Sequence, residues 1–94
     1  MLFSDYVELW LKEIKIKVDA VTYQHYEAEA RTHIIPFFRS AGVKLVDMDR
    51  QAIQNYVNFK FERGRLDGKG GLSATTLKHH RNVINQTLNL AVFN

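Results

Sequence analysis

Apolar residues recur at spacings of three and four along four separate stretches of this chain, and no other feature constrains its fold as strongly. In the first stretch, Val7, Trp10 and Ile14 share one face of a helix expected over residues 5–15, with Ser4 as its N-cap. Residues 14–18 alternate apolar and basic side chains, but the sequence holds no second strand signal to pair with them. We therefore interpret this segment as a connector between helices.

A proline interrupts the second stretch. Thr22 is expected to cap this helix. Its inner stripe is formed by Tyr23, Tyr26, Ala30, Ile34 and Phe37. Because Pro36 lacks a backbone N–H and disfavours helix at Ile35, the helix is expected to stop or kink there. A short turn over residues 36–40, ended by Gly42, is expected to follow.

The last two stretches have clear helix signals at their ends. Asp47 or Asp49 is expected to cap the third helix, and Gly64 to end it after Arg63. The residues expected to face inward from it are Ile53, Tyr56, Val57 and Phe61. Ser73 is expected to cap the last helix. The core stripe of that helix is expected to contain Leu77, Ile84, Leu88 and either Ala91 or Val92. The glycine-rich residues 64–71 are interpreted as a mobile loop.

Four amphipathic helices with short connections predict one all-α domain over residues 1–94, a compact bundle of four main helices plus a short turn after Pro36. The absence of cysteine excludes disulfides and thiolate metal sites and is consistent with a reducing cytoplasm. No apolar run approaches the roughly 18 residues that span a membrane, so no membrane partner is expected. The net charge of +3 favours nucleic acid as a partner without establishing it.

The histidines do not form a pattern typical of catalysis or metal binding. His25 and His33 are eight residues apart, and His79 and His80 are adjacent. A helical zinc site needs two ligands one turn apart with a third nearby. We therefore assign no metal, no cofactor and no catalytic residue, and interpret the histidines as solvated or at the edge of the core.

Two helices each present a polar face opposite their apolar stripe. On the last helix this face holds Thr75, Lys78, His79 and Asn82, and Asn85 and Gln86 extend it. On the second helix it holds Gln24, His25, Ala28 and Thr32. Lysine reaches phosphates, and threonine, asparagine and glutamine reach base edges, so these faces favour contact with DNA. Each face is also typical of a solvated polar surface without a partner. Periodicity alone does not show whether the two faces converge.

The ordered set of caps and core residues resembles the core-binding domain of tyrosine recombinases, the phage-type integrases. The resemblance runs from Phe3 to Val92. It is carried by Phe3, Val7 and Trp10, by Thr22-x-x-x-Tyr26, by His33-Ile34-x-Pro36 with Gly42, by Leu45-Val46-Asp47-Met48-Asp49, by Ile53-Gln54-x-Tyr56-Val57, by Leu72-Ser73-x-x-Thr76 and by Leu88-Asn89-x-Ala91-Val92.

This resemblance implies a SAM-like helical domain whose second and fourth helices approach the major groove of double-stranded DNA. The implied DNA-binding residues are Thr22, Gln24, His25, Thr75, Thr76, Lys78, His79 and Asn82, although the hydroxyl of Thr76 fits better at the start of its helix. The implied further partners are the catalytic domain of the same protein and other recombinase subunits. The implied setting is the cytoplasm, in a bacterial or phage-encoded protein.

The family's nucleophilic tyrosine, arginine pair and histidine belong to its catalytic domain, so this chain is expected to cut nothing. The apolar pattern still continues at Asn94, so the natural protein is expected to continue. A second hypothesis is a helical protein–protein interaction module without DNA binding, marked by an apolar patch around Phe59 or on the first helix.

Overall fold

The computed structural model describes residues 1–64, 68 and 70–93, with side chains up to residue 89. The helices are α1 (Phe3–Ile14), α2 (Ala20–Glu29), α3 (Ile35–Ala41), α4 (Arg50–Arg63) and α5 (Ala74–Phe93). A π-helical turn, η1 (Ala30–Ile34), joins α2 to α3, and a 3-10 turn, η2 (Leu45–Asp47), precedes α4. Since α2, η1 and α3 follow one another without a break, the fold has four main helical segments. The predicted all-α bundle is confirmed.

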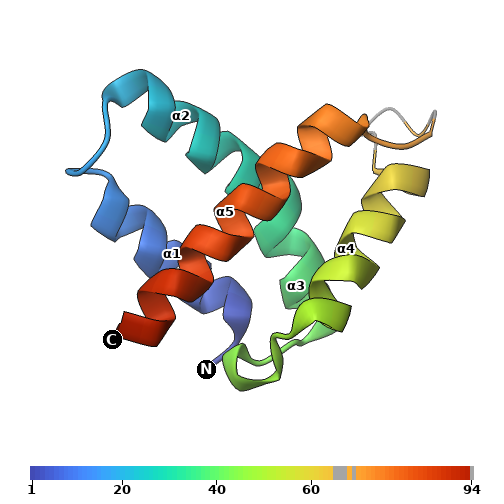
Figure 1. The fold of residues 1–94 in the computed structure, drawn as a ribbon, viewed down its shortest axis with the longest axis horizontal. Coiled ribbons are helices and arrows are strands. Elements are labelled where there is room, and N and C mark those ends of the chain that lie inside the picture. Colours follow the sequence, from blue (N-terminus) through green and yellow to red (C-terminus); the bar gives the residue numbers. More distant parts are fainter. Residues whose placement is uncertain (65–67, 69, 94) are drawn as a thin grey trace.

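Helix α5 lies across the other helices (Figure 1). It packs against α1, η1 and α4, so the last helix completes the hydrophobic core of the bundle. The amino terminus is fixed beside the connection from α3 to α4, because Phe3 N donates to the Val43 carbonyl (2.9 Å) and Leu45 N donates to the Met1 carbonyl (2.9 Å). Residues 15–18 form turns, as the connector interpretation expected.

The segment after Pro36 is helical, so the predicted short turn is wrong. Ile35 N donates to the Ala30 carbonyl, five residues back, and this wider turn keeps the backbone helical up to the proline. Pro36 then lies in the first turn of α3, where its missing N–H costs no hydrogen bond. Gly42, with φ of 68°, ends α3 in the left-handed conformation that glycine adopts without strain.

Two of the predicted helix caps are confirmed and two are wrong. Asp49 accepts from Ala52 N (2.8 Å) at the start of α4, and the hydroxyl of Ser73 accepts from Thr76 N (3.2 Å) at the start of α5. The cap of α2 is Asp19, which accepts the N–H of Thr22 (2.7 Å). Ser4 lies inside α1 and is buried, because α1 begins at Phe3 rather than near Asp5.

The core centres on an aromatic cluster in which α1, α3 and α4 meet. The Phe38 ring stacks on Tyr56 with ring centroids 5.3 Å apart, and Phe3 and Phe37 meet Phe38 edge to face at 5.0 and 5.1 Å. Trp10, Leu11, Ile34 and Ile84 are also buried. Such close contacts between rings add to the free energy gained by removing apolar surface from water.

The inward face of α5 is rotated from the one expected. Leu77 and Ile84 are buried as predicted, and Leu88 is half-buried, but the centre of the buried face also contains His80, Val83 and Thr87. Hydrophobicity alone could not assign His80 and Thr87 to the core. On α4, Tyr56 is buried and Ile53 and Val57 are half-buried, whereas Phe61 is 58% exposed, so its predicted inward placement is wrong.

Some expectations fall outside the described residues. The side chains of Ala91 and Val92 are not described. The glycine-rich stretch expected to be mobile includes residues 65–67 and 69, which also lie outside the described part.

A polar cluster, buried at Tyr56 and His80 and half-buried at His33 and Lys60, joins α4, η1 and α5. Tyr56 Oη and His80 Nδ1 are hydrogen-bonded at 2.7 Å, and the His80 ring lies 5.1 Å from that of His33. Lys60 Nζ donates to His33 Nδ1 at 3.2 Å. Burial raises the pKa of Tyr56, so its phenol keeps its proton, and burial together with nearby cationic groups lowers the pKa of His80 to about 4. Both groups are therefore neutral at pH 7.

We predict that Tyr56→Phe destabilises the domain by about 1–3 kcal/mol, because His80 Nδ1 is then buried without its partner. Urea denaturation measures the free energy of unfolding. Tyr26→Phe is the matched control, since the Tyr26 hydroxyl is half-buried and its partner Gln86 can turn to water. Equal losses in the two variants would contradict a special role for the Tyr56–His80 bond.

We also predict that stability falls as the pH is lowered from about 6.5 to about 4. In the unfolded chain a histidine has a pKa of about 6.5, so between these values the unfolded state binds a proton at His80 that the folded state does not. His80 alone should then cost about 2 kcal/mol between pH 7.5 and pH 5, measured by urea denaturation.

The control for this pH dependence is the double variant Tyr56→Phe with His80→Leu. It removes both partners of the hydrogen bond and leaves no buried polar group unpaired there. Its stability should fall much less between pH 7.5 and pH 5. An undiminished fall would assign the acid sensitivity to other groups.

Candidate nucleic-acid interface

The polar residues predicted on α5 form its exposed face. Thr75, Lys78, His79 and Asn82 are all exposed. Thr76 is half-buried, and its hydroxyl accepts a hydrogen bond from the Ser73 hydroxyl (3.0 Å). Thr76 therefore belongs to the start of the helix, as its alternative interpretation expected.

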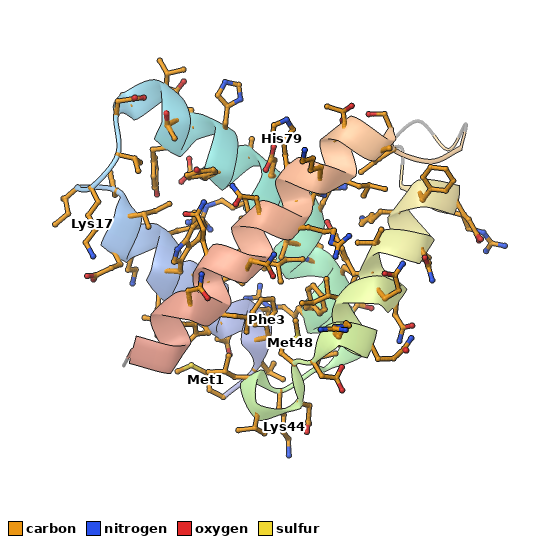
Figure 2. All side chains as sticks on the ribbon, viewed as in Figure 1. Met1, Phe3, Lys17, Lys44, Met48 and His79 are labelled. Carbon is orange, nitrogen blue, oxygen red and sulfur yellow. The ribbon has the colours of Figure 1, made fainter. Side chains whose placement is uncertain are left out.

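The residues predicted on α2 lie beside this face. Gln24 and His25 are exposed, and Thr22 is half-buried. The two helices are joined across their gap by a hydrogen bond from Gln86 Nε2 to Tyr26 Oη (3.3 Å). Figure 2 shows the labelled His79 on the side of α5 that faces α2.

Residues from both helices line one groove, which we call the α2/α5 groove. Its volume is about 330 Å³, and it is lined by Thr22, His25, Tyr26, Glu29, His79 and Asn82. Four of these six were predicted as DNA-binding residues from two stretches of sequence more than fifty residues apart. The structure thus brings together the two faces whose convergence periodicity left open. Gln24, Lys78, Thr75 and Thr76 are not among the residues that line this groove.

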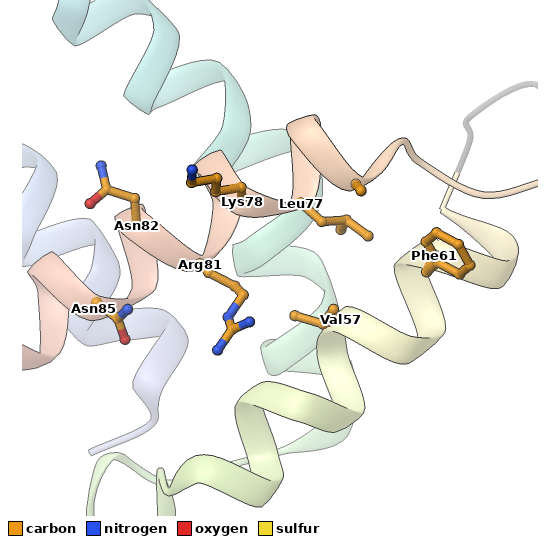
Figure 3. A pocket seen from close by; sticks show the side chains of 8 residues that line it. Val57, Phe61, Leu77, Lys78, Arg81, Asn82 and Asn85 are labelled. Atoms are coloured by element: carbon orange, nitrogen blue, oxygen red, sulfur yellow. The ribbon is translucent and has the colours of Figure 1, made fainter.

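A second groove, the α4/α5 groove, runs along the other side of α5 (Figure 3). Its volume is about 570 Å³, and Val57 and Phe61 of α4 face it together with residues of α5. Those α5 residues are Ala74, Leu77, Lys78, Arg81, Asn82 and Asn85. Asn82 lines both grooves, so the exposed ridge of α5 stands between two hollows.

Arg81 is a basic residue of this surface that sequence reasoning missed. It is exposed and extends toward the space between α5 and α4 (Figure 3). In the sequence it lies four residues after Leu77 and three before Ile84, which is the spacing of the predicted apolar stripe. Because His80 and Thr87 are buried, the true inward face is turned away from Arg81. The signal that could have found it is the run Lys78-His79-His80-Arg81, which spreads charge around the helix.

Charge is distributed unevenly over the molecule. No aspartate or glutamate occurs in residues 74–93, which form α5, and in the part of the chain that is described no ion pair involves Lys78 or Arg81. On the α1–α3 side, by contrast, arginines and carboxylates neutralise one another. Arg31 pairs with Glu8 (3.4 Å) and Glu27 (3.3 Å), and Arg39 pairs with Asp5 (3.3 Å) and Glu8 (3.2 Å). The unneutralised cations of the described surface around α5 are therefore available to an anionic partner.

Glu29 is the acidic residue of the α2/α5 groove. Burial raises the pKa of its carboxyl, and the neighbouring His79 and His25 oppose that shift when they are charged. The sequence analysis did not place Glu29 in the interface. Its i, i+4 spacing from His25 on α2 was the available signal.

The remaining titratable groups do not assemble into a centre for catalysis or metal binding within the described residues. No group of three or more potential ligands is positioned there to hold a metal ion. The pKa of Tyr56 is raised, which is the opposite of what a nucleophilic phenol requires. Among the same residues, no helix combines the length and apolar character needed to cross a bilayer.

One family of proteins matches most of the chain. The family model for the phage integrase N-terminal SAM-like domain matches residues 2–61, which include α1, α2, η1, α3, η2 and most of α4. The matched segment contains Thr22, Gln24 and His25, and it ends before α5, whereas the resemblance was expected to extend to Val92. No curated protein and no solved structure matches the chain. Since the matched residues make up well over half of the 94-residue chain, it belongs to the phage integrase N-terminal SAM-like domain family.

Proposed function

We propose that this chain is the DNA-binding module of a site-specific tyrosine recombinase. In this role it grips core recombination sites on double-stranded DNA and positions a catalytic domain of the same protein. Strand cleavage belongs to that catalytic domain, and other recombinase subunits are partners in the assembled complex. The observation that carries the proposal is the convergence of Thr22 and His25 with His79 and Asn82 around one groove.

The chemistry of this surface suits DNA. Lys78 and Arg81 supply positive charge for phosphates, and the exposed amides of Asn82 and Asn85 supply donors and acceptors for base edges. The first backbone N–H groups of α5 add a partial positive charge near Thr75. An exposed helix ridge with a hollow on each side also has the shape that a helix needs to enter the major groove. The proposed DNA-contacting set is therefore the predicted one without Thr76, with Arg81 and Asn85 added.

A protein–protein interaction module is the second hypothesis. Phe59 is 45% exposed, but its ring lies against that of Phe37 (5.4 Å), so it covers the core rather than standing free. Among the residues whose side chains are described, the most exposed large apolar ones are Ile16 (88%) and Val46 (87%). Ile16 precedes Lys17 and Val46 lies in η2 after Lys44, and Figure 2 shows Lys17 and Lys44 in separate parts of the molecule. Separated apolar residues such as these two do not form the contiguous exposed patch that marks a protein partner.

The expected result of an NMR titration with a short DNA duplex is a set of chemical-shift changes over residues 22–28 and 75–86. Because phosphate contacts supply most of the affinity, the changes should shrink as salt is added. Without the opposing catalytic domain, the dissociation constant should be roughly 10⁻⁶–10⁻⁴ M, near the non-specific range. Shifts confined to the surroundings of Phe59 or α1, or no salt-dependent shifts at all, would contradict the proposal.

Replacing Lys78 and His79 together by alanine should weaken DNA binding about equally for all sequences, because it removes a phosphate contact and one wall of the α2/α5 groove. Fluorescence anisotropy at several salt concentrations measures the binding constant. The slope of its logarithm against the logarithm of the salt concentration should decrease in magnitude by about one, which corresponds to one lost phosphate contact. Both side chains are exposed, so the melting temperature should change little.

Lys44→Ala is the matched control for that variant. It removes one positive charge from an exposed side chain. Lys44 immediately precedes η2 and lies far from His79 (Figure 2). If the Lys78/His79 double variant binds DNA as tightly as Lys44→Ala does, the proposed face is wrong.

A further inference from the structure

Glu29 is out of place on a surface that binds DNA only through its phosphates. It lines the α2/α5 groove between His25 and Tyr26 on one helix and His79 and Asn82 on the other. An ionised carboxylate repels phosphate oxygens, so a groove meant only for the backbone would not hold one. Its presence restricts what can enter the groove.

Within the described residues, the Glu29 carboxyl interacts with His25 and His79 through charge, without a hydrogen bond to either. Among these residues its carboxylate makes no hydrogen bond and no ion pair. Glu27, two residues earlier on the same helix, accepts from the Tyr23 hydroxyl (3.3 Å) and pairs with Arg31 (3.3 Å). Glu29 is half-buried, and burial raises its pKa, so keeping its charge in the groove carries a cost in free energy.

The chemistry of the base edges tells what an unpaired carboxylate can accept. An ionised carboxylate is only an acceptor of hydrogen bonds. In the major groove guanine presents two acceptors, which repel a carboxylate. Adenine presents an amino donor, but the acceptor beside it repels a carboxylate that binds there. Cytosine presents an amino donor, which is the established partner of glutamate at base edges.

We infer that Glu29 is a specificity-determining residue of the α2/α5 groove, and that its carboxylate accepts a hydrogen bond from the exocyclic amino group of a cytosine. This inference rests on the proposed function, because it requires the groove to face the major groove of DNA. His25, His79, Thr22 and Asn82 line the same groove and supply hydrogen-bond donors for the neighbouring bases and phosphates. Phosphates are then kept to the outside of the groove, near Lys78.

The experiment is a selection of duplexes from a pool with randomised positions, followed by sequencing of the bound fraction. The parent chain should enrich cytosine at one position by about 5-fold or more over the other bases. In Glu29→Gln this preference should move toward adenine, because an amide offers both a donor and an acceptor to the adenine edge. Glu29→Gln should also bind unselected DNA a few-fold more tightly, since one repulsive charge is lost.

Glu27→Gln is the matched control. It makes the same change in net charge on the same helix, but at a carboxylate that pairs with Arg31 outside the groove. It should keep the cytosine preference of the parent chain. Melting temperatures of both variants verify that the fold is retained.

The outcomes separate this inference from the proposed function. Salt-dependent binding with the same base preference in the parent chain and in Glu29→Gln would overturn the role of Glu29 and leave the DNA-binding function standing. A loss of preference that is equal in Glu27→Gln and Glu29→Gln would also overturn it, because net charge alone would then explain the result. No DNA binding by the parent chain would overturn both.

Discussion

The hydrogen bond between Tyr56 and His80 determines how α5 is turned about its axis, and the exposed surface of the domain depends on that rotation. The bond is short (2.7 Å) and lies in the core, where an unpaired imidazole would cost free energy. With His80 held inward, Val83, Ile84 and Thr87 also face the core. The opposite side of the helix must then carry Lys78, Asn82 and Thr75 outward. A buried polar pair thus sets the orientation of the face that we propose for DNA.

The π-helical turn η1 serves the same arrangement from the other side. It accommodates Pro36 without ending the helix, so α2, η1 and α3 form one continuous helical segment. It also carries His33 to within 5.1 Å of the His80 ring and within 3.2 Å of Lys60 Nζ. The position of α2 relative to α5, and with it the α2/α5 groove, is therefore linked to the packing of the core. In Figure 1, α5 crosses the segment that joins α2 to α3, and η1 and α5 are in contact.

Electrostatics divides the molecule into two kinds of surface. On the α1–α3 side, Arg31 and Arg39 are paired with carboxylates, so little charge is left for a partner. Exposed ion pairs of this type contribute little stability, and their main effect here is to neutralise that side. Helix α5 has no acidic residue, which leaves Lys78 and Arg81 as the cations next to the two grooves. The match to the integrase family ends before this helix.

The sequence by itself determined the helices, most of their ends and the two polar faces, because periodicity and capping depend on residues within one or two turns. The helix of residues 50–63, capped by Asp49 and ended at Gly64, is an example. Tertiary structure decided that the two faces converge, that Glu29 and Arg81 join them, and that His80 is buried. His80 is buried only because Tyr56, 24 residues earlier, supplies a partner for its ring. Such pairings join distant parts of the chain, and no local pattern specifies which polar residue will find one.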